Sequence, residues 1–171
     1  GGRRGVLGGS RAEQVRRVST AFAELLATPG VQEHLELRGE VGVMAYHGGS
    51  LEETTDVVAS AVAERTGASY YGVLQPPDLN WHIPSHHVLA EHSPALTQFF
   101  ERVHTVITIH GFGRRGLFTS LLLGGRNRRL AEHVGGHLRE ALPAYEVVTD
   151  LETIPKELRG QHHHNPVNVP A

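Results

Sequence analysis

The sequence contains no cysteine. This absence excludes a disulfide framework, a thiolate zinc finger, an iron–sulfur cluster and a cysteine nucleophile. No uninterrupted apolar run approaches the roughly 18 residues that a membrane-spanning helix needs, so we expect no membrane partner. The chain also has no large excess of positive or negative charge, because Lys+Arg 16 against Asp+Glu 18 leaves a net charge of −2. That balance gives no general electrostatic attraction to nucleic acid, and no nucleic-acid partner is expected.

What the chain does contain fits one folded domain. Its 171 residues are 39% hydrophobic and 20% charged, which is enough apolar material for a core. Residues 1–9 are rich in glycine and arginine and no apolar stretch follows them, so we interpret them as a flexible tail and not as a signal peptide. The prediction is therefore a single domain over residues 10–171 in a cytoplasmic protein.

Hydrophobic periodicity predicts alternating helices and strands. Helices are expected over residues 10–27 (with a capping box of Ser10 and Glu13), 50–66, 93–102 and 126–142, and strands over 40–46, 68–75, 103–110, 117–123 and 145–149. In the second helix, Leu51, Val58 and Val62 are among the expected apolar positions. The alternation indicates an α/β fold with a largely parallel sheet and helices on both faces.

The first candidate site is the segment 47–53, HGGSLEE, where a strand ends and a helix begins. Ligands of open α/β sheets usually bind at such places. If Ser50 is the helix N-cap, Glu53 falls three residues later and folds back to the cap. Glu52 is then free to point towards His47. The alternative is a plain glycine-rich turn followed by a capped helix.

A second histidine, His110, also follows an apolar strand and precedes a glycine. Parallel neighbouring strands would bring His47 and His110 to one edge of the sheet. With thirteen histidines and no cysteine, a metal site here must use imidazole and carboxylate. His47, Glu52 and His110 would form the ligand set of many catalytic zinc sites, with one position open to water. The alternative for each histidine singly is a buried, hydrogen-bonded side chain.

An anion-binding site is predicted where Gly124-Gly125 precedes a helix. Arg126 could bind a carboxylate through two hydrogen bonds while Asn127 donates another. Arg114 and Arg115, soon after His110, add positive charge to the same rim. For Arg128 and Arg129 we favour a solvated helix end.

Two further histidine-rich segments are less specific. Trp81 and His82 lie in a polar loop and could form a wall of the substrate site, although a merely anchored loop fits as well. The triplet His162–His164 resembles a ligand cluster, but three adjacent side chains on a flexible tail do not all face one preorganised ion.

Several of these motifs, taken together and in order from about Leu25 to Asn168, resemble the poly-γ-glutamate hydrolase family. The segments that carry the resemblance are Met44–Gly49 with Glu52, Trp81-His82 with Ser85, Thr108–Gly111, Leu123–Asn127 and Asn165–Asn168. The resemblance implies a three-layer fold similar to the zinc carboxypeptidases and zinc-dependent hydrolysis of γ-linked glutamyl amides. It implies one zinc ion bound by His47, Glu52 and His110, and a carboxylate-binding pair at Arg126-Asn127. The implied partner is an anionic γ-glutamyl polymer or peptide.

The resemblance leaves the general base unassigned. Family members usually continue into a strand with a glutamate near the metal, whereas this sequence ends at Ala171. Either the sequence is truncated, or the base differs, or the protein is not fully active; Glu152 and Glu157 are the in-chain candidates. The alternatives to a poly-γ-glutamate depolymerase are a zinc amidase or carboxypeptidase acting on cell-wall γ-glutamyl peptides, and a non-catalytic binding domain of the same fold.

Overall fold

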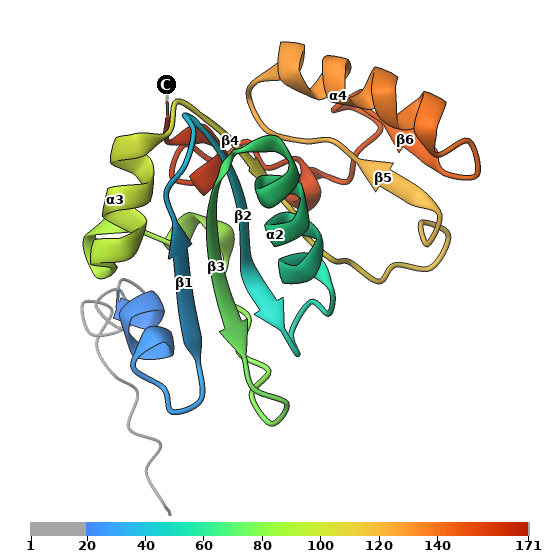
Figure 1. Cartoon of the computed structure of the whole chain (residues 1–171). Coiled ribbons are helices and arrows are strands. Elements are labelled where there is room, and N and C mark those ends of the chain that lie inside the picture. Colours follow the sequence, from blue (N-terminus) through green and yellow to red (C-terminus); the bar gives the residue numbers. More distant parts are fainter. Residues whose placement is uncertain (1–19, 171) are drawn as a thin grey trace, which may run out of the picture.

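The computed structural model describes residues 20–170, and its centre is a mixed sheet (Figure 1). Its strands are β1 (Gln32–Glu36), β2 (Val41–Gly49), β3 (Ser69–Gln75) and β4 (Thr105–Thr108), in the spatial order β1-β3-β2-β4. Strand β2 pairs with both β3 and β4 in parallel, while β1 pairs with β3 in the antiparallel direction. The predicted α/β class with a mostly parallel sheet is confirmed.

Helices cover both faces of this sheet. Alternate side chains of β2 point to opposite faces, as the twofold periodicity of a strand requires. Val43 and Ala45 pack with the alanines of α2 (Thr55–Thr66). Met44 and Tyr46 belong to the larger core on the other face, with α3 (Pro94–Arg102) and the helical residues 20–26. Each fully buried large apolar side chain contributes about 1.5–3 kcal/mol to folding, so this second face carries most of the apolar stabilisation.

A smaller lobe lies beside the central sheet (Figure 1). It consists of the parallel pair β5 (Ser120–Leu122) and β6 (Glu146–Val148) with helix α4 (Arg128–Ala141). The Arg128 guanidinium donates to the carbonyls of Leu123, Gly124, Gly125 and Thr149. Arg128 therefore joins the loop before α4 to the end of β6, and the expected solvated position is wrong for this residue.

Helix α2 begins five residues later than predicted, so the assignment of Ser50 as its N-cap is wrong. The Ser50 hydroxyl donates instead to the Pro76 carbonyl at 2.6 Å, a contact between loops that local sequence does not reveal. Thr54 precedes the helix with φ 71°, a left-handed conformation that is costly for a β-branched residue. Glu53 consequently lies in the turn before the helix and forms no capping box with Ser50.

The buried face of α2 also differs from the expectation. Ala59 and Ala63 are fully buried against the sheet, whereas Val58 and Val62 are 46% and 39% exposed. Small side chains let the helix lie close to the strands, so packing distance and not hydrophobicity selects the inward face. Leu51 lies before the helix and is only half-buried.

Strand β1 was not predicted, because its sequence QEHLE is polar and four of its five residues are exposed. An edge strand of this kind shows no apolar signal. The remaining strands lie within their predicted ranges or extend them by a few residues at one end, and α3 starts at the predicted cap, where the Ser93 hydroxyl accepts from the Leu96 N–H. The predicted capping box of Ser10 and Glu13, like the predicted tail, lies outside the described residues.

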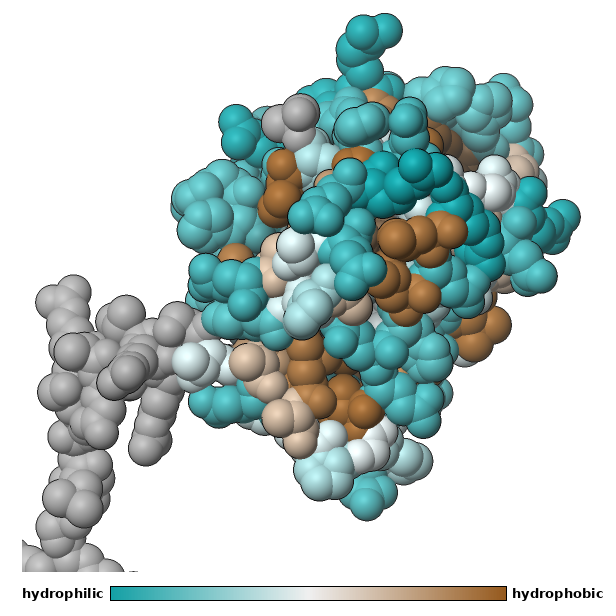
Figure 2. Space-filling view, turned by 60° about the vertical axis from the view of Figure 1, so that its left-hand side comes forward, coloured by the Kyte–Doolittle hydropathy of each residue, from teal (hydrophilic) through white to brown (hydrophobic). Residues whose placement is uncertain are grey.

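On the face drawn in Figure 2, the surface of the described residues is mainly hydrophilic. Figure 2 shows one side of the molecule, where separate apolar patches lie between polar side chains. Such patches are normal on folded proteins. No helix among residues 20–170 is long and apolar enough to cross a membrane.

Candidate metal centre

The two histidines reach one edge of the sheet because β2 and β4 are parallel neighbours. Their register pairs Met44 with Thr108, and the Ile109 N–H donates to the Met44 carbonyl at 2.9 Å. His47 lies near the end of β2 and His110 follows β4 by two residues. The expectation that both strands deliver an imidazole to the same carboxyl edge is confirmed.

A tight turn after β2 returns the chain to His47. Gly49 has φ 71°, and a Cβ atom there would lie 2.3 Å from the Gln75 carbonyl oxygen, so only glycine fits. The Asp56 carboxylate accepts from the Gly49 N–H at 3.0 Å, and the Glu52 N–H donates to the His47 carbonyl at 2.9 Å. The turn therefore positions Glu52 beside the histidine.

The Glu52 carboxylate lies between the two imidazoles. Its Oε1 is 3.0 Å from His47 Nδ1, and its Oε2 is 3.1 Å from His110 Nδ1. The Gly111 N–H donates to the same Oε2 at 3.0 Å. One ligand atom from each of His47, Glu52 and His110 lies within 4.8 Å of the others, so the group could hold a metal ion.

The outer nitrogens of both rings are occupied, which directs Nδ1 to the centre. His47 Nε2 donates to the Ile83 carbonyl at 2.8 Å, and since a carbonyl only accepts, the proton is on Nε2. With Nε2 occupied, Nδ1 faces the Glu52 carboxylate, where either a proton or a metal ion on Nδ1 can join the two groups. His110 Nε2 lies 2.9 Å from the Tyr46 hydroxyl. Such orienting partners are typical of metal-binding histidines, so the residues present fit a metal ion.

The electrostatics favour an ionised carboxylate at the centre. Burial raises the pKa of Glu52, but hydrogen bonds with His110 and His47 and the charges of both rings outweigh it and lower the pKa to about 2. Glu52 is therefore a carboxylate at all ordinary pH values. The side chains of His47 and Glu52 are 2% and 12% exposed, whereas that of His110 is 34% exposed, so the group opens to solvent on the His110 side.

The predicted loop residues lie at different distances from this group. The His82 ring packs on His47 with centroids 4.7 Å apart, and burial together with the charge of His47 lowers the pKa of His82. Trp81 instead anchors the loop, because its backbone exchanges two hydrogen bonds with the Gln75 side chain. Of this pair, only His82 is in contact with the candidate ligands.

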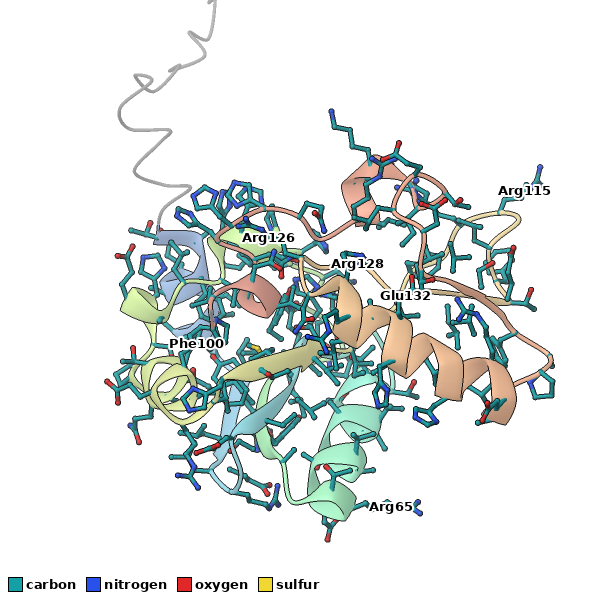
Figure 3. The ribbon with its side chains drawn as sticks, turned by 90° about the horizontal axis from the view of Figure 1, so that it is seen from above. Arg65, Phe100, Arg115, Arg126, Arg128 and Glu132 are labelled. Carbon is teal, nitrogen blue, oxygen red and sulfur yellow. The ribbon has the colours of Figure 1, made fainter. Side chains whose placement is uncertain are left out.

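The predicted anion site is fixed by backbone contacts. The Arg126 N–H donates to Asn168 Oδ1 at 2.9 Å, and Asn127 Oδ1 accepts from the Leu130 N–H as the N-cap of α4. Figure 3 shows Arg126 and Arg128 where α4 begins, while Arg115 points outward from a peripheral loop. Arg115 is thus separated from Arg126.

The two candidate bases are engaged by arginines. Glu157 pairs with Arg114 at 2.8 Å, and Glu152 pairs with Arg159 at 3.3 Å. Both carboxylates are largely exposed, and neither belongs to the group formed by His47, Glu52 and His110. Arg114, predicted to bind substrate, is thereby partly neutralised.

Three supporting residues were given no role in the sequence analysis. The Ile83 carbonyl could not be found, because a backbone contact leaves no residue-type signal. Tyr46 and Ser85 were visible within the motifs: Ser85 hydrogen-bonds to Tyr46, and Tyr46 contacts His110. Tyr46 directly precedes His47 on a buried strand, and burial raises its pKa, so its hydroxyl stays protonated.

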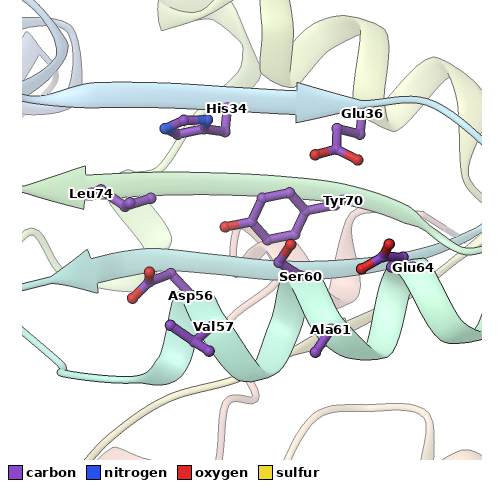
Figure 4. Close-up of a pocket in the computed structure, with 9 residues that line it drawn as sticks. All are labelled: His34, Glu36, Asp56, Val57, Ser60, Ala61, Glu64, Tyr70 and Leu74. Atoms are coloured by element: carbon purple, nitrogen blue, oxygen red, sulfur yellow. The ribbon is translucent and has the colours of Figure 1, made fainter.

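A groove of about 370 Å³ lies elsewhere, between α2 and the neighbouring strands β1 and β3 (Figure 4). Its lining comes from β1, β3 and α2 and includes Glu36, Tyr70, Leu74, Val57 and Glu64. None of the candidate metal ligands lines it. The candidate site is therefore defined by converging polar groups and not by this hollow.

The fold and the site together define an α/β protein in which parallel strands bring two imidazoles and a carboxylate to one sheet edge, as a group that could hold a metal ion. The family model described as poly-gamma-glutamate hydrolase matches residues 20–171. The chain therefore belongs to the poly-γ-glutamate hydrolase family, as the sequence motifs indicated. Searches of curated proteins and of solved structures found no match.

Proposed function

We propose that this chain is a zinc-dependent hydrolase that cleaves γ-glutamyl amide bonds within poly-γ-glutamate. The observation that carries the proposal is the position of the Glu52 carboxylate between two imidazole Nδ1 atoms whose outer nitrogens are already bonded. Membership of the family supports the hydrolytic reaction and a polyglutamate substrate.

The donor set favours zinc. Two imidazole nitrogens and one carboxylate suit zinc, whereas magnesium and calcium prefer oxygen ligands. When bound, the ion supplies Lewis-acid activation of water and of an amide carbonyl near neutral pH. His47, Glu52 and His110 would hold it, and the exposed side of His110 leaves the solvent face for substrate.

Substrate recognition is assigned to Arg126 and to the loop at His82. A γ-linked glutamyl chain carries a free carboxylate on each unit, and an exposed guanidinium can bind one through two hydrogen bonds. The Arg126 N–H donates to the Asn168 side chain, which fixes the backbone position from which the Arg126 side chain extends. His82, packed on His47, forms the adjacent wall.

The test is the loss of viscosity of poly-γ-glutamate on incubation with the zinc-loaded chain. We expect cleavage of the γ-linked polymer, loss of cleavage after chelation and recovery with zinc, and no cleavage of α-linked polyglutamate of equal length. Cleavage of cell-wall γ-glutamyl peptides but not of the polymer would assign the substrate to the cell wall. Binding of the polymer without any cleavage would reduce the chain to a binding domain.

A further inference from the structure

The groove between α2 and strands β1 and β3 has no part in the candidate metal centre (Figure 4). Helix α2 packs mainly on β2 and β3, so the sheet face beside the edge strand β1 stays uncovered, and His34 and Glu36 of β1 are exposed there. The groove volume of about 370 Å³ lies within the range of small-molecule sites, roughly 300–1,000 Å³. The groove can therefore hold a small organic ligand.

The floor of the groove is largely apolar and centres on Tyr70. Gly72 leaves room for the Tyr70 ring, because a Cβ atom at Gly72 would lie 2.2 Å from the tyrosine hydroxyl oxygen. Leu74 of β3 and Val57 and Ala61 of α2 add apolar side chains to the lining. Val57 is 63% exposed, so this part of the wall is available to the hydrocarbon part of a ligand.

The Tyr70 hydroxyl faces this groove without a protein partner. Tyr70 is only 4% exposed, yet within residues 20–170 nothing hydrogen-bonds to its hydroxyl. Burial, together with the charges of Asp56 and Glu36, raises the pKa of Tyr70 to about 12, so the hydroxyl keeps its proton. A polar group this buried normally has a partner, and its oxygen can accept from a ligand that donates.

Carboxylates lie at both ends of the floor. Asp56 and Glu64 are eight residues apart on α2, which is about 12 Å at 1.5 Å per residue. Figure 4 shows Asp56 at the end towards which the tyrosine hydroxyl points, and Glu36 and Glu64 at the other end. Glu36 also pairs with Arg38. None of the described residues that line the groove is a lysine or an arginine, so both ends favour positive charge.

The spacing of these carboxylates excludes a single metal ion. In the described part of the chain, none of them belongs to a group of three or more ligands close enough to hold a metal. Two separated negative ends with an apolar floor between them instead suit an elongated cation, whose charges are at its ends and whose middle is hydrocarbon.

We propose that this groove binds a linear aliphatic polyamine. One terminal ammonium group donates to the Asp56 carboxylate and to the Tyr70 hydroxyl. The other terminal ammonium group binds between Glu36 and Glu64, and the methylene chain lies on the apolar floor. This site does not rest on the function proposed above.

Calorimetric titration of spermidine into the full chain tests the proposal. We expect saturable binding of about one molecule per chain, and weaker binding of the shorter diamine putrescine, which does not reach both ends. Tyr70→Phe keeps the ring and removes the hydroxyl, so it should weaken spermidine binding about two- to tenfold, the effect of losing a hydrogen bond. Glu64→Gln should weaken it by up to about fivefold, as expected for an exposed ion pair.

The matched control is Glu132→Gln, which removes an exposed carboxylate from α4 and should leave the spermidine affinity unchanged. Circular dichroism checks that each variant is folded. If Tyr70→Phe is not folded, Val57→Lys replaces it: this substitution, at an exposed position, places a competing ammonium group in the groove and should weaken binding more than Glu64→Gln does.

Absence of saturable spermidine binding overturns the proposal. Equal weakening by Glu64→Gln and Glu132→Gln also overturns it, because the attraction would then follow net charge and not the groove. Binding of trilysine without binding of spermidine overturns it too, and would assign the groove to a basic peptide. None of these measurements involves zinc or hydrolysis, so failure of this site and failure of the proposed function are distinguishable.

Discussion

Glu52 and Glu53 are adjacent in sequence but different in environment, so the pair forms a matched test of the metal centre. Glu52 accepts hydrogen bonds at the centre and is 12% exposed, whereas Glu53 is exposed on the turn before α2. We expect Glu52→Gln to abolish zinc binding and Glu53→Gln to leave it intact.

The magnitude follows from linkage between binding and folding. An ion that binds only the native state adds about 2.7 kcal/mol of stability at a free concentration of 100 Kd. For a domain of this size, 1 kcal/mol shifts the melting temperature by roughly 2–4 °C, so zinc should raise it by about 5–10 °C. Glu52→Gln should remove this shift. In the metal-free state the substitution should also lower the free energy of unfolding by about 2 kcal/mol, because the donors of His47, His110 and Gly111 lose a charged acceptor.

The assay is thermal unfolding followed by circular dichroism, with chelator and with added zinc. The Glu53→Gln chain should melt like its parent under both conditions. A zinc-induced shift that persists in Glu52→Gln but vanishes in Glu53→Gln would refute the reasoning, because the ligand would then be the neighbouring residue.

Three further predictions concern substrate binding, ligand orientation and backbone strain. Arg126→Ala should lower kcat/KM on γ-linked glutamate oligomers about ten- to a hundredfold, which is the effect of losing a charge-assisted hydrogen bond, and zinc should remain bound. Arg129→Ala, at an exposed arginine, is the control. Equal losses on an uncharged amide substrate would contradict a carboxylate-binding role for Arg126. Tyr46→Phe should weaken zinc binding about 10–100-fold, because His110 loses the hydroxyl that orients its ring. Tyr145→Phe, at an exposed tyrosine, is the control and should leave zinc binding unchanged. Unchanged zinc affinity in Tyr46→Phe would exclude the orienting role. Thr54→Gly should raise the free energy of unfolding, measured in urea, by about 0.5–1 kcal/mol. The left-handed conformation costs a non-glycine residue about 1–2 kcal/mol, and the greater entropy that glycine has in the unfolded chain cancels part of this gain. A decrease would show that Thr54 is not strained.

The sheet and the convergence of His47 with His110 were largely predictable because their signals are local. Each buried strand is a run of apolar residues, and His47 and His110 each close such a run before a glycine. The rule that parallel strands place their carboxyl ends together then predicts the convergence of the two rings. Glu52 was selected over Glu53 by a capping argument that the structure overturns, and the resemblance to the family pointed to the same residue.

The features that escaped prediction depend on contacts between distant segments. Ser50 is a good N-cap residue by type, but in the fold its hydroxyl bonds to Pro76. The inward face of α2 is set by how closely the helix approaches the sheet, which favours Ala59 over Val58. The meeting of His86 with His162 joins residues from two loops, and no periodicity relates them.

The most direct test of the candidate metal centre is the zinc content of the purified full chain, measured by elemental analysis after dialysis. We expect about one zinc per chain, and none when His110→Ala removes one of the three ligands, because three protein ligands are the usual minimum for a catalytic zinc. His104→Ala, at a histidine whose side chain is 77% exposed, is the control and should keep the metal. Full zinc occupancy in the His110→Ala chain would contradict the account.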